Sequence, residues 1–113
     1  MIQQNRRMAS ISISSSGDST IIPAPGDGKY LAIDHINFVT AGAVTVQFKI
    51  GPPSLPTNYG GTYPLTTNQA VTLENAYQGE DGIITCGNDG IFIINLGGAV
   101  QVSGFVRYRI CGE

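Results

Sequence analysis

The residues best suited to chemistry in this sequence are its one histidine, His35, and the aspartate before it, Asp34. An imidazole oriented by a carboxylate can act as a general base. Adjacent strand residues point to opposite faces of a sheet, however, so the two side chains can meet only if a bulge turns one of them. No serine or cysteine can be assigned beside them as a nucleophile. We therefore interpret His35 as a structural residue of a bulged strand, and we expect that the protein is not an enzyme.

The carboxylates that might face a substrate fall in turns. Glu80 and Asp81 come just before Gly82, and Asp89 comes just before Gly90. A glycosidase needs two carboxylates that face one substrate, whereas Asp-Gly in a turn is explained by the backbone alone. A calcium ion between these two turns is the alternative, because both turns offer oxygen ligands. We interpret the three residues as turn residues and expect no metal and no cofactor.

Two cysteines, Cys86 and Cys111, supply the only thiols. Their spacing matches no zinc or redox signature, and His35 adds too few ligands to complete a metal site. We expect a thiol buried in a strand for Cys86 and a loose terminal thiol for Cys111. A disulfide between them is the alternative and needs neighbouring strands, which the sequence does not show.

Charge is scarce, since 12% of the 113 residues are charged, against about 25% in a typical soluble domain. A free monomer needs a charged surface to stay dispersed, so a surface this poor in charge favours contact with other subunits. The net charge of −2 gives nucleic acid no overall electrostatic attraction. The most apolar run, GIFIINLGGAV, is too short to span a bilayer. We expect protein partners, with neither nucleic acid nor a membrane among them.

Arg6 and Arg7 form the one basic cluster, in the polar start MIQQNRRM. This start has no hydrophobic periodicity and cannot bury enough apolar surface to offset its ordering entropy. We therefore predict a flexible N-terminal arm over residues 1–8, either solvated or in contact with a protein, and a single domain over residues 9–113. A nucleic-acid-binding tail is the alternative for the arm, but two phosphate contacts would give it little affinity. The arginines are followed by MASISISSSG, where a secretory signal would have its apolar core, so we expect no such signal.

The rest of the chain consists of short alternating runs separated by Gly, Pro, Asn and Asp, a pattern typical of antiparallel sheets. In KYLAIDHINFVT the apolar parity changes between Ile33 and Ile36, which predicts a bulge at Asp34–His35. The following TAGA predicts a tight hairpin. GPPSLPTNYGG, residues 51–61, predicts a long irregular loop that exposes Leu55 and Tyr59.

Eight or nine such strands, with no connection long enough for a parallel crossover, predict an antiparallel β-sandwich of jelly-roll type. The run from Ile91 to Ile94 has no polar face and predicts a central strand covered on both sides. The inward-facing residues expected in the core are Val46, Phe48, Phe92, Ile94, Val102 and Val106.

The last strand, GGAVQVSGFVRYRI, alternates between two kinds of residue. Its inward parity holds Val100, Val102, Val106 and Tyr108, and its outward parity holds Phe105, Arg107 and Arg109. Aromatic residues and arginine are enriched at protein interfaces. The alternative is a solvent face with one stray aromatic residue. We predict that the three outward residues form a face that contacts another protein chain.

Three segments of the chain form a further pattern: STIIPAPGDGKYLAIDHINFVTAGAVTVQFKIG, YPLTTNQAVTLE and GGAVQVSGFVRYRI. Through these segments the chain resembles a loose group of small tailed-phage virion proteins over about residues 18–110. In that group a Gly-rich turn leads into a long strand, an AVTVxFKxG hairpin follows, and a GxVxYR-like strand closes the chain. The resemblance implies a jelly-roll-like sandwich used as a capsid decoration (cement) protein or as a fibre or spike module, often as an oligomer. It implies no catalytic residues.

We therefore expect a structural virion protein of a bacteriophage, assembled in the host cytoplasm, that decorates the outer capsid surface through its N-terminal arm and strand faces. The expected partners are the major capsid protein or other virion proteins, and further copies of the chain, with a trimer favoured. The expected interface residues are Arg6, Arg7, Leu55, Tyr59, Phe105, Arg107 and Arg109.

Two alternatives carry different functions. The first is a tail fibre, a spike or a carbohydrate-binding receptor module, in which Tyr59 and Tyr63, with Asn58 and Asn68, would stack on sugar rings. The second is a small jelly-roll enzyme of the cupin type. That enzyme needs several metal-binding histidines, which His35 alone cannot supply.

Overall fold

Alternating apolar and polar residues form nine β-strands in the part of the chain that the computed structural model describes, residues 6–74 and 82–112. The strands are β1 (Arg6–Ile13), β2 (Gly17–Ile22), β3 (Lys29–Thr40), β4 (Val44–Gly51), β5 (Thr57–Leu65), β6 (Ala70–Glu74), β7 (Ile84–Asn88), β8 (Ile91–Leu96) and β9 (Val102–Gly112). These residues contain no helix long and apolar enough to cross a membrane.

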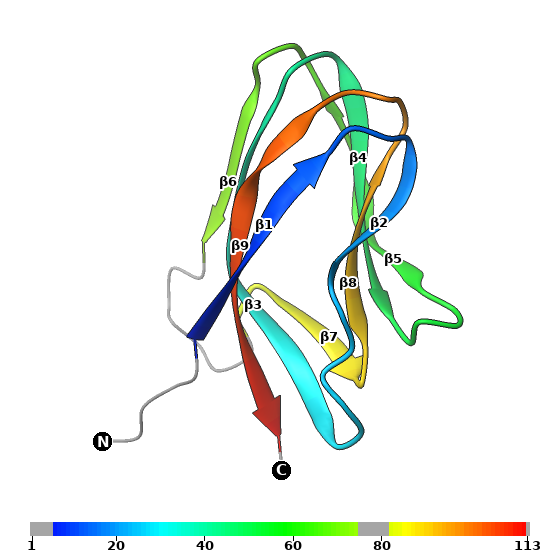
Figure 1. Cartoon of the computed structure of the whole chain (residues 1–113), viewed down its shortest axis with the longest axis vertical. Helices are drawn as coiled ribbons and strands as arrows, with labels where there is room; N and C mark the ends of the chain where they lie inside the picture. The colour runs from blue at the N-terminus through cyan, green and yellow to red at the C-terminus, as the bar shows by residue number, and fades with distance from the viewer. Residues whose placement is uncertain (1–5, 75–81, 113) are drawn as a thin grey trace.

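Two antiparallel sheets pack against each other (Figure 1). One sheet has the order β1-β9-β3-β6, with β7 also paired to β3, and the other has the order β2-β8-β4-β5. The chain passes repeatedly between the two sheets, so that most sequence neighbours are not sheet neighbours. This order is that of a jelly roll. The predicted antiparallel sandwich is confirmed.

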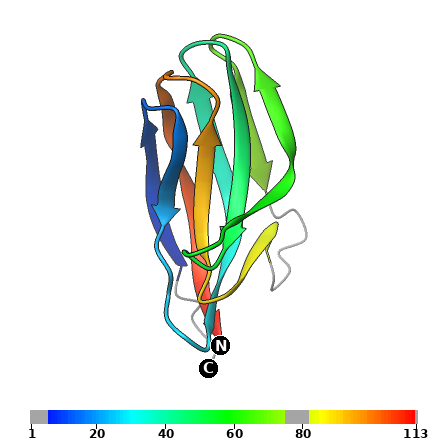
Figure 2. The ribbon, with the colours of Figure 1, turned by 90° about the vertical axis from the view of Figure 1, so that its right-hand side faces the viewer.

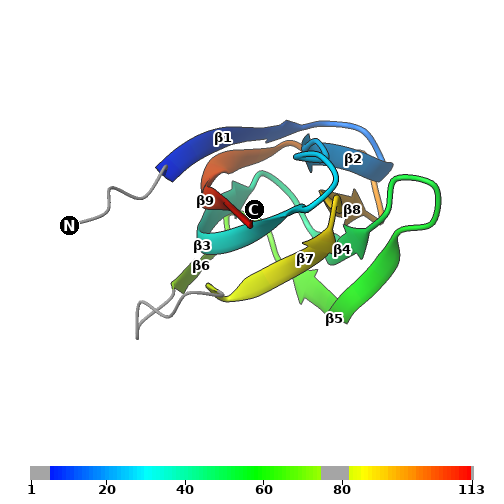
Figure 3. The ribbon, with the colours of Figure 1, turned by 90° about the horizontal axis from the view of Figure 1, so that it is seen from below.

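The strands run along the long axis of a domain that measures 42 × 30 × 21 Å (Figure 2). Viewed from below, β1 and β2 lie at one edge of the sandwich, and β5 and β6 lie at the other (Figure 3). The outer face of the first sheet is therefore bounded by β1 on one side and by β6 on the other.

The core between the sheets is built from the inward parity of each strand. Phe48 on β4 packs edge-on against Phe38 of β3 and stacks on Phe92 of β8, with ring centroids 6.5 Å and 5.7 Å away. Burial of each such ring contributes about 1.5–3 kcal/mol. All six residues expected in the core are buried: Val46, Phe48, Phe92, Ile94, Val102 and Val106.

The predicted bulge in β3 is present. Ile33 pairs with Tyr108 and His35 pairs with Arg107, so Asp34 is an extra residue without a counterpart on β9. The extra residue lets Leu31 and Ile33 face the core before the bulge while Ile36 and Phe38 face it afterwards. The bulge thus resolves the parity change in the sequence.

β8 is central, between β2 and β4, and its residues from Ile91 to Ile94 are all buried, as predicted.

Two local predictions were wrong. The TAGA segment does not close a hairpin, because β3 and β4 belong to different sheets and the turn carries the chain across the core. The loop predicted over residues 51–61 is shorter than expected. β5 already begins at Thr57, and its residues pair with β4 from that point.

Candidate functional site

A row of stacked side chains lies on the outer face of the first sheet. The ring of Phe105 on β9 stacks on the imidazole of His35 on β3, with centroids 5.4 Å apart and planes 5° from parallel. The guanidinium of Arg107 lies over the same Phe105 ring, 5.6 Å from its centroid. A cation–π contact of this kind contributes about 0.5–1 kcal/mol of stability at an exposed site.

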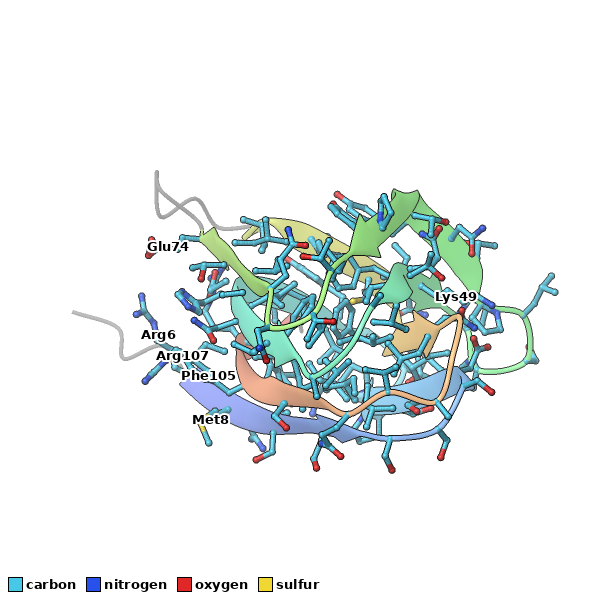
Figure 4. All side chains as sticks on the ribbon, turned by 90° about the horizontal axis from the view of Figure 1, so that it is seen from above. Arg6, Met8, Lys49, Glu74, Phe105 and Arg107 are labelled. Carbon is cyan, nitrogen blue, oxygen red and sulfur yellow. The ribbon has the colours of Figure 1, made fainter. Side chains whose placement is uncertain are left out.

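The row continues to both edges of the sheet. His35 Nδ1 lies 3.8 Å from the Glu74 carboxylate on β6, and Met8 on β1 is opposite Arg107 in the strand register. Met8 is 59% exposed, the largest value for an apolar side chain on this face. Arg6, Met8, Phe105, Arg107 and Glu74 gather on the same side of the molecule, away from Lys49 (Figure 4). We call this set, with His35, the aromatic–arginine face.

Arg109 does not belong to this face, contrary to the sequence prediction. It has the outward parity, but it is only 6% exposed. Its Nε and Nη2 donate to Oδ2 and Oδ1 of Asp34 at 2.7 Å and 2.9 Å. These hydrogen bonds to Asp34 raise the pKa of Arg109 above its ordinary value. The physical reason is the bulge, which places the Asp34 carboxylate where it draws the guanidinium into a buried bidentate pair.

The boundary of the predicted N-terminal arm also needs correction. Arg6, Arg7 and Met8 belong to β1 and pair with Arg109, Tyr108 and Arg107 of β9. Pairing along β9 supplies the backbone partners that this polar stretch cannot provide for itself. Residues 1–5 lie outside the described part of the chain. Both arginines remain exposed at the start of the strand.

Leu55 lies in the β4–β5 connection and Tyr59 on β5 of the second sheet, so the structure does not gather all the predicted interface residues on the outer face of the first sheet. Leu55 is 71% exposed between β4 and β5. Tyr59 and Tyr63 on β5 are each about two-fifths exposed. They border a hollow of about 240 Å³ at the edge of the sandwich, which is otherwise lined by Phe48, Gly60, Leu73, Glu74, Ile83 and Ile84. The Tyr59 hydroxyl donates to the Ile83 carbonyl at 3.4 Å.

Asp34 and His35 do not form a general-base pair. The Asp34 carboxylate accepts from Arg109, whereas His35 contacts Glu74 and Phe105. Asp89 also has a structural contact, because its carboxylate accepts the Gly26 N–H at 2.9 Å. The other partners of the considered calcium site, Glu80 and Asp81, lie outside the described residues. Within residues 6–74 and 82–112, no three His, Cys, Asp or Glu side chains cluster as metal ligands would.

The two thiols are separated by a strand. Cys86 on β7 is buried as predicted, and burial raises the pKa of its thiol to about 12. Cys111 is half-buried and belongs to β9, so it is not the loose terminal thiol that the sequence indicated. β7 and β9 pair with opposite edges of β3. Both cysteines are therefore free.

Sequence reasoning missed Met8, His35 and Glu74 as parts of the face. The sequence pattern places Met8 in the predicted arm and indicates only a bulge at His35. The sequence does contain a signal that His35 faces outward. After the predicted bulge, the alternation that buries Ile36 directs His35 and Asn37 to the outer face. The neighbours of β3 across the sheet were not available, because they follow from the jelly-roll order and not from local pattern.

Comparison with known proteins assigns the chain to no family and finds weak structural likenesses. No family model and no curated protein matches the chain. The crystal structure of PirA is similar over 98% of this chain and 97% of that one, with a TM-score of 0.36 and 9% identity. A chain in the structure of infectious bursal disease virus Gx strain is similar over 92% of this chain, with a TM-score of 0.37 and 11% identity. The present chain spans about a third of that viral chain, at 32%.

Proposed function

We propose that the protein is a structural virion protein of a bacteriophage, a capsid decoration protein without enzymatic activity. The observation that carries the proposal is the aromatic–arginine face. It presents one aromatic ring, one exposed methionine and two arginines on a sheet whose own core is complete without them. The sequence resemblance to small tailed-phage virion proteins supports the choice of class.

The chemistry of this face suits a protein partner. Neither Arg6 nor Arg107 is paired with a carboxylate among the described residues, and the Phe105 ring is only partly covered. Aromatic residues and arginine stabilise interfaces because rings bury area at low entropic cost and guanidinium groups pair bidentately with carboxylates. The proposed partner is the major capsid protein or another virion protein. Repeated copies, with a trimer as the favoured unit, would let weak contacts add up over a lattice.

A count of copies in purified particles tests the proposal. A decoration protein should be present at a copy number comparable to that of the capsid protein, as measured by quantitative mass spectrometry of particles. A count of a few copies per particle would assign it to the tail, and absence from particles would contradict a structural virion role.

A matched pair of variants tests the face itself. Phe105→Ser with Arg107→Ser changes two partly or fully exposed side chains, so folding should be spared to within about 0.5 kcal/mol per site. Binding to particles that lack the protein should fall at least tenfold. The control, Leu55→Ser with Lys29→Ser, removes an exposed apolar residue and an exposed cation elsewhere and should bind as the wild type does. Loss of binding in the control alone would move the contact surface to the β4–β5 end of the domain.

A carbohydrate-binding tail module is the second candidate, and the hollow between Tyr59 and Tyr63 is the observation that favours it. Two half-exposed tyrosines beside a carboxylate, Glu74, offer stacking and a hydrogen-bond acceptor to a sugar ring. Under this reading the wild type, but not Tyr63→Ala, should retain glycans on an array. Few copies per particle would accompany that result.

A further inference from the structure

β1 differs from the other edge strands in the described part of the chain, because most of its length, from Met8 to Ile13, has no feature that blocks further pairing. It ends the order of the first sheet, so one side of its backbone has no strand partner (Figure 3). Its register with β9 is unbroken over eight residues, from Arg6 to Ile13. The segment from Met8 to Ile13 contains no Pro, no Gly and no charge. An edge of this kind is a template for an added strand.

The other described edges are protected. β2 has a register shift after Thr20 and ends before Pro23. β5 also has a register shift, and it contains Gly60, Gly61 and Pro64. β6 and β7 are five residues long. Bulges, prolines and short length are the devices by which sheets avoid edge-to-edge pairing.

The charges near β1 indicate the chemistry of the added strand. Arg6 and Arg7 begin β1, and Arg107 lies opposite Met8 in the register. None of these three has a hydrogen bond or ion pair with a carboxylate among the described residues. Arg6 and Arg107 lie on the same side of the molecule (Figure 4). In a chain of net charge −2, this end of β1 concentrates positive charge that no described carboxylate pairs with.

The described part of a second copy of the chain is a poor source of negative charge for these arginines. Asp18 pairs with Lys49, and Asp34 pairs with Arg109. The remaining three carboxylates each contact another group: Asp27 accepts from Asn88, Glu74 lies near His35, and Asp89 accepts from Gly26. A partner from another protein can supply carboxylates that are still unpaired.

We propose that β1 binds an extended segment of another protein by antiparallel strand addition, and that this segment ends in acidic residues that pair with Arg6 and Arg7. Alternate side chains of the segment would lie beside Met8, Ser10 and Ser12 on the outer face. Main-chain hydrogen bonds supply the affinity in this mode, and side chains supply the selectivity. The inference rests on the proposed function only for the source of the segment, which would be a virion protein.

A capped synthetic peptide, VTVTVVEE, is a suitable probe. In antiparallel register its first residue lies opposite Ile13 and its two glutamates lie opposite Arg7 and Arg6. Titration into the ¹⁵N-labelled protein should shift the amide signals of residues 6–13 and saturate. The peptide VTVTVVKK, which has the same strand propensity and the opposite charge, should bind at least about tenfold more weakly, since opposite-charge pairs across strands stabilise and like pairs destabilise. EEVVTVTV presents the glutamates in the parallel sense and should also bind weakly.

Exchange of the charges provides the decisive comparison. Arg6→Glu with Arg7→Glu should reverse the preference, so that VTVTVVKK becomes the better ligand. Lys29→Glu, an exposed cation on β3, is the control and should leave the preference unchanged. Because the exchange restores binding to a different peptide, a folding defect cannot produce the expected result.

Several outcomes would overturn the inference. One is equal binding of the two antiparallel peptides, and another is signal shifts confined to residues outside β1. If the isolated protein runs at twice its 11.9 kDa mass with the amides of β1 protected from exchange, a second copy occupies the edge instead. If a single-stranded DNA oligonucleotide binds this end of β1 more tightly than VTVTVVEE does and displaces the peptide, the three arginines bind nucleic acid instead. Failure of the peptide test would leave the particle count untouched, so the two proposals fail separately.

Discussion

The guanidinium of Arg109 and the carboxylate of Asp34 form a bidentate ion pair, Nε to Oδ2 at 2.7 Å and Nη2 to Oδ1 at 2.9 Å, on the outward-facing side of a sheet. The Arg109 side chain is 7% exposed and that of Asp34 is 20% exposed. The pair joins β3 to β9 at the one position where their register shifts. It therefore ties the last strand to the bulge and ends the aromatic–arginine face at Arg107.

Removing one partner of this pair should destabilise the protein strongly. Asp34→Ala leaves the Arg109 charge largely buried without that carboxylate, and Arg109→Met leaves Asp34 without its guanidinium. Each change should lower the free energy of unfolding by about 3 kcal/mol, the lower end of the range for a buried pair because Asp34 keeps some contact with water. Urea denaturation measures the loss.

The double variant, Asp34→Ala with Arg109→Met, should cost clearly less than the sum of the two single changes, because no unpaired charge remains. If each single variant costs less than about 0.5 kcal/mol, the pair behaves as an ordinary exposed ion pair. Arg109 would then be available to a partner, as the sequence suggested.

Arg109 shows why the interface could be predicted only in part from the sequence. Alternation correctly assigned Phe105, Arg107 and Arg109 to one parity, and Phe105 and Arg107 do lie on the outer face. Parity states the direction of a side chain, however, and not what covers it. The bulge at Asp34 was predicted from the same sequence, but its alignment with Arg109 depends on the pairing of β3 with β9, which are about 75 residues apart.

The β-sandwich could be predicted from the sequence, because it depends on the local alternation of apolar and polar residues. The unbroken apolar run from Ile91 to Ile94 indicated a central strand, and β8 is central. The TAGA turn shows the limit of that reasoning. A short Gly-containing connection suits a hairpin equally well as a turn between sheets, and only the global packing of β3 and β4 on opposite sides of the core decides between them.

The aromatic centre of the core should carry much of the stability. Phe48→Ala removes a ring that contacts Phe38 and Phe92, and it should lower the free energy of unfolding by about 3–5 kcal/mol, as should Phe92→Ala. That loss is a large part of the total stability of a small domain. Phe48→Leu, which keeps most of the volume, should cost less. A loss below about 1 kcal/mol for either alanine variant would contradict the register of β4 and β8.

The two thiols should differ in reactivity. Burial raises the pKa of Cys86 to about 12, against 9.0 for an ordinary thiol, so at pH 8 almost no thiolate is present there. A disulfide reagent should modify Cys111 in the folded protein and Cys86 only after denaturation. In the variant Cys111→Ser, rapid labelling without denaturant would show that β7 opens readily.

The same pKa predicts a loss of stability in alkali. The folded protein holds Cys86 neutral, while the unfolded chain ionises near pH 9.0. The contribution is therefore fully present below pH 9 and is lost as the pH rises toward about 12. Thermal melting of the wild type and of Cys86→Ala between pH 8 and pH 10.5 should show a steeper decline for the wild type. Parallel declines would indicate that another group controls the alkaline limb.

Gly104 provides the most demanding test of the packing of β9 against β3. It has the inward parity, opposite Phe38 in the register, and a Cβ at this position would collide with the Asn37 carbonyl oxygen and lie 2.6 Å from the Phe38 Cα. Since these are backbone atoms, a side-chain rotation cannot relieve the contact, and the two strands would have to separate. Gly104→Ala should therefore cost at least about 1–3 kcal/mol, the usual cost of overpacking a core. Gly61→Ala, a strand glycine on β5 with no atom within 4 Å of the added Cβ, is the matched control and should change the urea midpoint little. If Gly104→Ala has the same urea midpoint as Gly61→Ala, the close approach of β3 and β9 is wrong. The positions of His35 and Phe105, and the aromatic–arginine face that depends on that approach, would then be wrong as well.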